Sequence, residues 1–117
     1  MLNQIQVLVI GRHKEIMETV LRLINSTPDW EAVGALEDEA AIELFQLRRF
    51  DLVLIGGGLE PESEAKLRAI FRFQNPLVRI IQHFGGAGRD LFADIRTALE
   101  VQREGHVSLL DNPFGSV

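Results

Sequence analysis

Phe50-Asp51-Leu52-Val53-Leu54-Ile55-Gly56-Gly57-Gly58 is the stretch that decides the fold of this chain. Its aliphatic run, Leu52 to Ile55, is typical of a strand that is covered on both faces of a sheet. Strands of this kind belong to the parallel sheets of α/β proteins. The three glycines then end the strand without contributing a side chain. The stretch therefore predicts a strand of a parallel α/β sheet, and it predicts no reactive side chain directly after that strand.

Strand and helix patterns alternate on both sides of this stretch. We expect strands at residues 5–10, 30–36, 50–55, 77–82 and 107–110, and helices at 13–25, 40–49, 61–73 and 90–102. Strands that alternate with helices form a parallel sheet with right-handed crossovers and helices on both faces. The pattern predicts one domain spanning residues 1–117. Its class is a three-layer α/β, flavodoxin-like fold with five parallel strands in the order 2-1-3-4-5.

The helical spacing also predicts which side chains are buried. The first helix should bury Ile16, Met17, Val20, Leu21 and Ile24 along one face. In the second, Asp38 is expected to be the N-cap residue, and Arg48 and Arg49 should lie in the last turn. In the third, Ile70, Phe71 and Phe73 are expected to pack in the core, after an acidic first turn with Glu60, Glu62 and Glu64.

Composition excludes several classes of function. The 117 residues carry a net charge of −5 with acids and bases interspersed, so we expect no nucleic-acid binding. Cysteine is absent, which removes disulfides, thiolate metal sites and cysteine nucleophiles. No apolar run approaches the roughly 20 residues that span a bilayer, and the first residues lack the basic start of a signal peptide. We expect a cytoplasmic protein without membrane contact.

Two longer stretches resemble a known family. Residues 30–44, WEAVGALEDEAAIEL, lead into Phe50 to Ile55, and residues 105–114, GHVSLLDNPF, stand near the end of the chain. Together they resemble the response-regulator receiver (CheY-like) domain, with glycine, proline and phenylalanine of the second stretch at matching spacing. The resemblance covers nearly the whole chain and implies the flavodoxin-like fold described above.

The same resemblance implies five positions for phosphotransfer, and this chain departs from the pattern at all of them. Two acids that help hold Mg²⁺ correspond to Gly11 and Arg12, and the phospho-accepting aspartate corresponds to Gly56. A Ser or Thr after strand four corresponds to Phe84, with Gln82 and His83 as the alternatives, and a lysine before the last proline corresponds to Asn112. The resemblance therefore implies a pseudo-receiver: not an enzyme, without a cofactor, and acting through protein contacts in bacterial signalling.

An alternative function rests on the glycine-rich loops at the carboxyl edge of the sheet. Their backbone N–H groups can form a nest for a small anionic ligand of the phosphate or nucleotide type, although no phosphate-loop or dinucleotide motif is present. His13 and His83 belong near the same edge, but two histidines are a poor metal site, and we predict no metal centre. The candidate ligand-binding residues are Gly57, Gly58, Gly85, Gly86, Gly88 and Arg89.

The end of the chain suggests a partner. Receiver domains close with a helix after the fifth strand, and here only three residues follow Phe114, so the final helix is expected to be missing. The face of strands four and five and the first helix would then lack its cover, and exposed apolar surface of this kind usually marks an interaction site. We expect a homodimer through that face, or another protein partner.

Overall fold

The computed structural model describes residues 4–56 and 58–82. The expected helix at 90–102, the expected strand at 107–110 and the question of a final helix lie outside the described residues. Within them, strands and helices alternate as the sequence predicts. The elements are β1 (Ile5–Ile10), α1 (Lys14–Asn25), β2 (Trp30–Ala35), α2 (Asp38–Leu47), β3 (Leu52–Ile55), α3 (Pro61–Gln74) and β4 (Arg79–Gln82).

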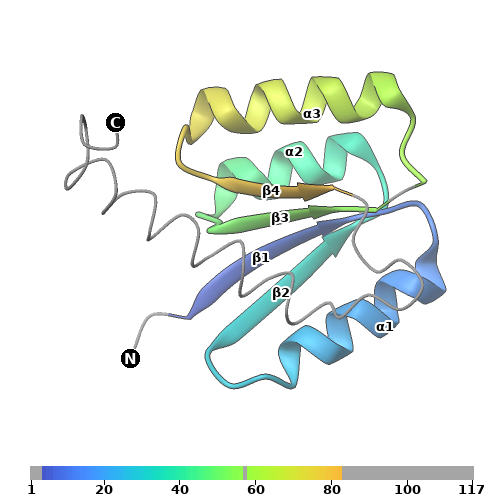
Figure 1. Ribbon diagram of the computed structural model, residues 1–117, viewed down its shortest axis with the longest axis vertical. Coiled ribbons are helices and arrows are strands. Elements are labelled where there is room, and N and C mark those ends of the chain that lie inside the picture. The colour runs from blue at the N-terminus through green and yellow to red at the C-terminus, as the bar shows by residue number, and fades with distance from the viewer. Residues whose placement is uncertain (1–3, 57, 83–117) are drawn as a thin grey trace, which may run out of the picture.

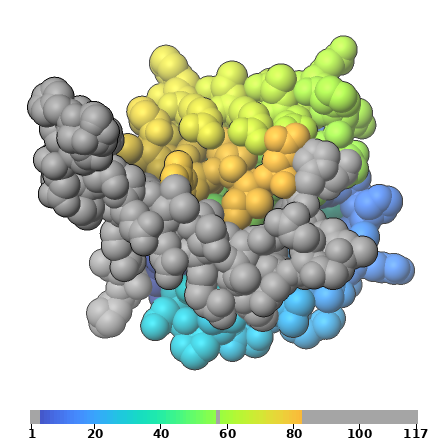
Figure 2. All heavy atoms as spheres, viewed as in Figure 1, coloured from blue at the N-terminus to red at the C-terminus, as the bar shows by residue number. Residues whose placement is uncertain are grey.

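The strands form one parallel sheet in the order β2-β1-β3-β4. This confirms the predicted order for the first four strands. Helix α1 covers one face of the sheet, and α2 and α3 lie side by side on the other (Figure 1). In the described part of the chain β4 is an edge strand, and its atoms reach the surface beside α3 (Figure 2). All strands point the same way, so the loops that follow them meet at one edge of the sheet.

Alternation along the strands divides the core into two halves. Leu8 and Ile10 of β1 point to the α2 and α3 side, whereas Val7 and Val9 point to the α1 side. The first half contains a column of aromatic rings: the centroid of Phe45 lies 4.3 Å from that of Phe71 and 6.0 Å from that of Phe50. On the α1 side, Met17, Val20 and Ile24 complete the core. The fold therefore depends on two separate apolar layers that share the sheet.

Four local predictions are wrong. Ile16 is exposed, because the buried stripe of α1 follows Met17, Val20 and Ile24. Asp38 is not the N-cap: Glu37 precedes the first turn of α2 and makes no side-chain cap. Helix α2 ends at Leu47, so Arg48 and Arg49 lie beyond its last turn. Phe73 points to solvent and is 88% exposed.

None of the helices in residues 4–56 and 58–82 is long and apolar enough to cross a bilayer.

Candidate functional site

The candidate site is the carboxyl edge of the sheet, where β1 and β3 end side by side. Ile10 is in register with Ile55, and the Gly56 N–H donates to the Ile10 carbonyl over 2.8 Å. The Gly11 N–H donates to the carbonyl of Ala35, at the end of β2, over 3.2 Å. Two of the five positions singled out in the sequence, Gly11 and Gly56, thus lie at neighbouring strand ends. Neither offers a side chain to bind or react.

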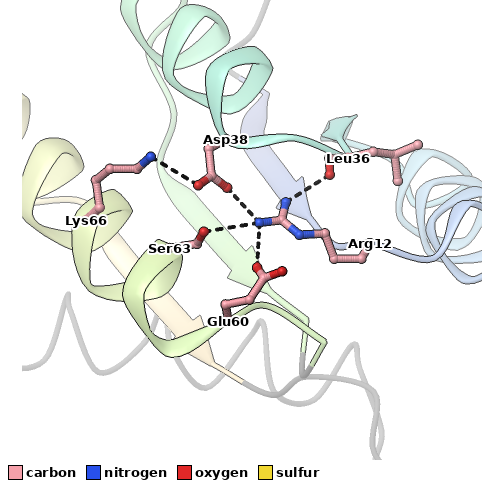
Figure 3. A network of polar contacts seen from close by, with 6 residues as sticks. All are labelled: Arg12, Leu36, Asp38, Glu60, Ser63 and Lys66. Atoms are coloured by element: carbon pink, nitrogen blue, oxygen red, sulfur yellow. Dashed lines mark hydrogen bonds and ion pairs between the residues drawn. The ribbon is translucent and has the colours of Figure 1, made fainter.

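The third position, Arg12, is the centre of a polar network that sequence reasoning missed. Its guanidinium Nη2 donates to Asp38 Oδ1 over 2.8 Å, to Glu60 Oε1 over 3.0 Å and to Ser63 Oγ over 3.3 Å (Figure 3). Nη1 donates to the Leu36 carbonyl over 2.9 Å. One arginine after β1 therefore links the start of α2 to the start of α3, across the top of the sheet.

Asp38 is the buried anion of this network. It is 8% exposed, and its second oxygen, Oδ2, lies 3.2 Å from Lys66 Nζ. Burial alone would raise the pKa of Asp38, but hydrogen bonds from Ser63, Arg12 and Lys66 and the charge of Arg12 outweigh burial and lower it to about 2. The hydrogen bond to Asp38 in turn raises the pKa of Arg12 above its usual value. The network therefore keeps both charges at any physiological pH.

This pKa gives the network a pH dependence. The folded-state pKa of Asp38, about 2, lies below its ordinary value of 3.8, so its contribution to stability is complete above about pH 4 and is lost as the pH falls toward 2. We expect the difference in free energy of unfolding between the wild type and Asp38→Asn to shrink by up to about 2 kcal/mol between about pH 6 and pH 2. Urea unfolding at both pH values measures it, and an unchanged difference would contradict the assignment.

The Mg²⁺ that receiver chemistry requires does not fit these residues. Arg12 brings a fixed cation to the place where the resemblance expects a metal ligand, and it binds Asp38 Oδ1 and Glu60 Oε1. Lys66 binds the other oxygen of Asp38. Mg²⁺ needs several oxygen ligands in octahedral geometry, and a neighbouring guanidinium would repel it. Among the described residues, no group of three or more His, Cys, Asp or Glu side chains is arranged to hold a metal ion.

The other candidate residues are only partly described. A Cβ atom on Gly58 would lie 3.6 Å from His13 Nε2, so the His13 side chain lies beside this glycine, at the same edge as Arg12. Glu60, which the acidic run predicts at the start of α3, does lie at its N-cap, but it binds Arg12. Outside the described residues lie His83, Phe84, Gly57, Gly85, Gly86, Gly88, Arg89 and Asn112. The anionic-ligand alternative therefore stays a prediction.

Comparisons with known proteins bear on the fold. No protein-family model matches the chain, and no curated protein matches it. Among solved structures, the signal receiver domain of an HD domain-containing protein from Pseudomonas fluorescens Pf-5 is 18% identical. The match covers 87% of this chain and 99% of that one, with a TM-score of 0.58.

Two further structures agree with this match. A chain from the complex of the histidine kinase ThkA with the response regulator protein TrrA is 16% identical, with a TM-score of 0.64 and coverage of 85% of this chain and 98% of that one. The receiver domain of the hybrid histidine kinase CckA is 14% identical, with a TM-score of 0.54 and coverage of 83% and 97%. The chain thus has the fold of the response-regulator receiver domain, as the sequence resemblance implies.

Proposed function

We propose that this chain is a phosphorylation-independent receiver-like domain that works through protein contacts in bacterial signalling and has no enzymatic activity. The observation that carries the proposal is the guanidinium of Arg12, which lies among Asp38, Glu60 and Ser63 at the edge where a receiver domain needs carboxylates. A cation stands where a metal ligand is needed, and the acids near it are already neutralised.

Phosphotransfer to a receiver requires a nucleophile and a counter-charge in addition to the metal. Gly56 directly follows β3 and has no side chain, so the position that the resemblance assigns to the nucleophile has no carboxylate. The sequence also has Phe84 and Asn112 at two further positions of the receiver pattern. Without the carboxylate there is no nucleophile to accept the phosphoryl group, and without the metal ligands the charge of that group is not neutralised during transfer.

A role in protein contacts is what this fold retains once phosphotransfer is lost. One of the similar structures contains a histidine kinase bound to a response regulator, so a domain of this fold takes part in a protein complex there. The chain itself exposes large apolar side chains on its helices, including Ile16 and Leu23 on α1. These two lie on the helix for which we predict a homodimer. We also propose that the protein is located in the cytoplasm.

The proposal is tested by titrating the full chain with Mg²⁺ and beryllofluoride, a phosphoryl mimic, and following the amide NMR signals of Gly11, Arg12 and Gly56. We expect these signals to stay in place, because no carboxylate is available for either ion. A receiver domain that has its acceptor aspartate serves as the positive control. Saturable shifts at the end of β1 and β3 would show that the edge still binds a phosphoryl group, and the proposal would be wrong.

A further inference from the structure

Strand β2 forms one edge of the sheet. In the described part of the chain it pairs only with β1, and β4 lies at the other edge (Figure 1). Its six residues run in parallel register with β1, from the pair Ile5 and Trp30 to the pair Ile10 and Ala35, without a break. The outer side of an edge strand presents backbone N–H and C=O groups to which a strand of another molecule can pair. Such an edge promotes association unless something covers it.

The sequence of β2 lacks the usual protection of an edge strand. Proteins protect such edges with prolines, lysines, bulges or charged side chains. Strand β2 contains neither proline nor lysine, and its continuous register excludes a bulge. Its one charged side chain is Glu31, which accepts a hydrogen bond from Gln6 Nε2 of β1 over 3.0 Å and lies 3.6 Å from Arg48. This charge is therefore used between neighbouring elements.

The backbone of β2 shows which groups face away from β1. Successive residues of a strand direct their N–H and C=O groups to alternate sides. The Ala35 carbonyl accepts a hydrogen bond from the N–H of Gly11, which follows β1, over 3.2 Å. Position 35 therefore faces β1, as do positions 33 and 31. The residues whose backbone groups face outward are Trp30, Ala32 and Gly34.

Asn25, the last residue of α1, covers the outward groups of Ala32. The Ala32 N–H donates to Asn25 Oδ1 over 2.8 Å, and Asn25 Nδ2 donates to the Ala32 carbonyl over 3.1 Å. A side-chain amide has the donor and the acceptor of a peptide group. The Asn25 carboxamide therefore occupies the place that a peptide group of an added strand would take. At the start of the strand, the Trp30 N–H donates to the Thr27 carbonyl over 3.2 Å.

Gly34 cannot protect the edge with a side chain of its own. A Cβ atom at this position would collide with Met17 Sδ on α1, so a charged side chain has no room there. Among the described residues, Asn25 is thus the side chain that closes the middle of the β2 edge.

We propose that Asn25 protects the β2 edge from strand-to-strand pairing with a second copy of this chain. Ala32 is the third of the six residues of β2, so an incoming strand needs both of its backbone groups and must first displace the carboxamide. The inference goes beyond the proposed function, because it states which edge of the domain is closed to strand addition. Association of two copies through a helical face is compatible with it.

The test compares variants of Asn25 by sedimentation velocity at rising protein concentration. Asn25→Ala and Asn25→Ser cannot bond both groups of Ala32, so we expect each to bind a second copy at least about tenfold more tightly than the wild type does. Asn25→Lys loses the same two bonds but protects the edge by its charge, and it should sediment as the wild type. The control Ser26→Ala removes the bond from Ser26 Oγ to the Leu23 carbonyl at the same helix end and leaves β2 untouched.

Amide hydrogen exchange gives a second measurement that does not depend on the folding of any variant. In the wild type we expect the Ala32 amide to exchange more slowly than the Gly34 amide, because Asn25 bonds the first of these outward groups. In Asn25→Ala the Gly34 amide should become protected as the protein concentration rises, since an added strand would bond it.

The proposal has three results that would overturn it. The first is sedimentation of Asn25→Ala and Asn25→Ser as the wild type, or wild-type exchange at Ala32 as fast as at Gly34. The second is association of Asn25→Lys as strong as that of Asn25→Ala, which would give Asn25 a purely structural role. The third is association that leaves exchange at Gly34 unchanged, because the contact would then lie away from the β2 edge.

Discussion

Replacing Phe71 by alanine is expected to lower the free energy of unfolding by about 3–5 kcal/mol, the usual cost of deleting a fully buried phenylalanine ring. Phe71 is 0% exposed, and its ring stacks on Phe45 at 4.3 Å between α2 and α3. The substitution leaves a cavity that the rigid sheet cannot fill, and it removes an aromatic contact as well. Urea unfolding followed by circular dichroism measures the loss.

Phe73 is the matched control, because it lies on the same helix two residues away. We expect Phe73→Ala to change the free energy of unfolding by no more than about 0.5 kcal/mol, as is usual for exposed positions. Similar losses for the two variants would contradict the assigned burial of α3.

Replacing Arg12 by alanine is expected to lower the free energy of unfolding by about 2–3 kcal/mol, because it leaves the buried Asp38 carboxylate with fewer partners. Lys66 and Ser63 remain close to Asp38, which keeps the loss below that of a fully isolated buried charge. The same urea experiment measures it, with the exposed Arg22→Ala as the control.

A further variant shows whether the loss comes from the charge pair. Adding Asp38→Ala to Arg12→Ala should restore part of the lost free energy of unfolding, because no buried charge is then left unpaired. The pairing would be contradicted if the double variant, Arg12→Ala with Asp38→Ala, lost more free energy of unfolding than the two single variants lose when their losses are added. So would an Arg12→Ala variant as stable as Arg22→Ala.

The sequence predicted the α/β fold because each strand can be recognised from a short run of adjacent residues. The aliphatic runs of β1 and β3 can be read from adjacent residues, and the parallel order follows from the helices between them. The Arg12 network cannot be predicted from adjacent residues. Its partners Asp38, Glu60 and Ser63 stand 26, 48 and 51 positions away, and each is an ordinary helix-start residue. Only the fold brings them to one edge.

The exposure of Phe73 was predictable in principle. Residues two apart on a helix point to nearly opposite sides, so a buried Phe71 implies an exposed Phe73. The prediction that Phe73 is buried was wrong because it considered how many apolar residues end this helix and ignored their spacing.

The most direct test of the account is the intact mass of the chain after incubation with acetyl phosphate and Mg²⁺, beside a receiver domain that has its acceptor aspartate. The account predicts that the control gains the mass of one phosphoryl group and that this chain does not, because Gly56 and Arg12 stand where nucleophile and metal ligand are needed. A Mg²⁺-dependent gain of one phosphoryl group by this chain would contradict it.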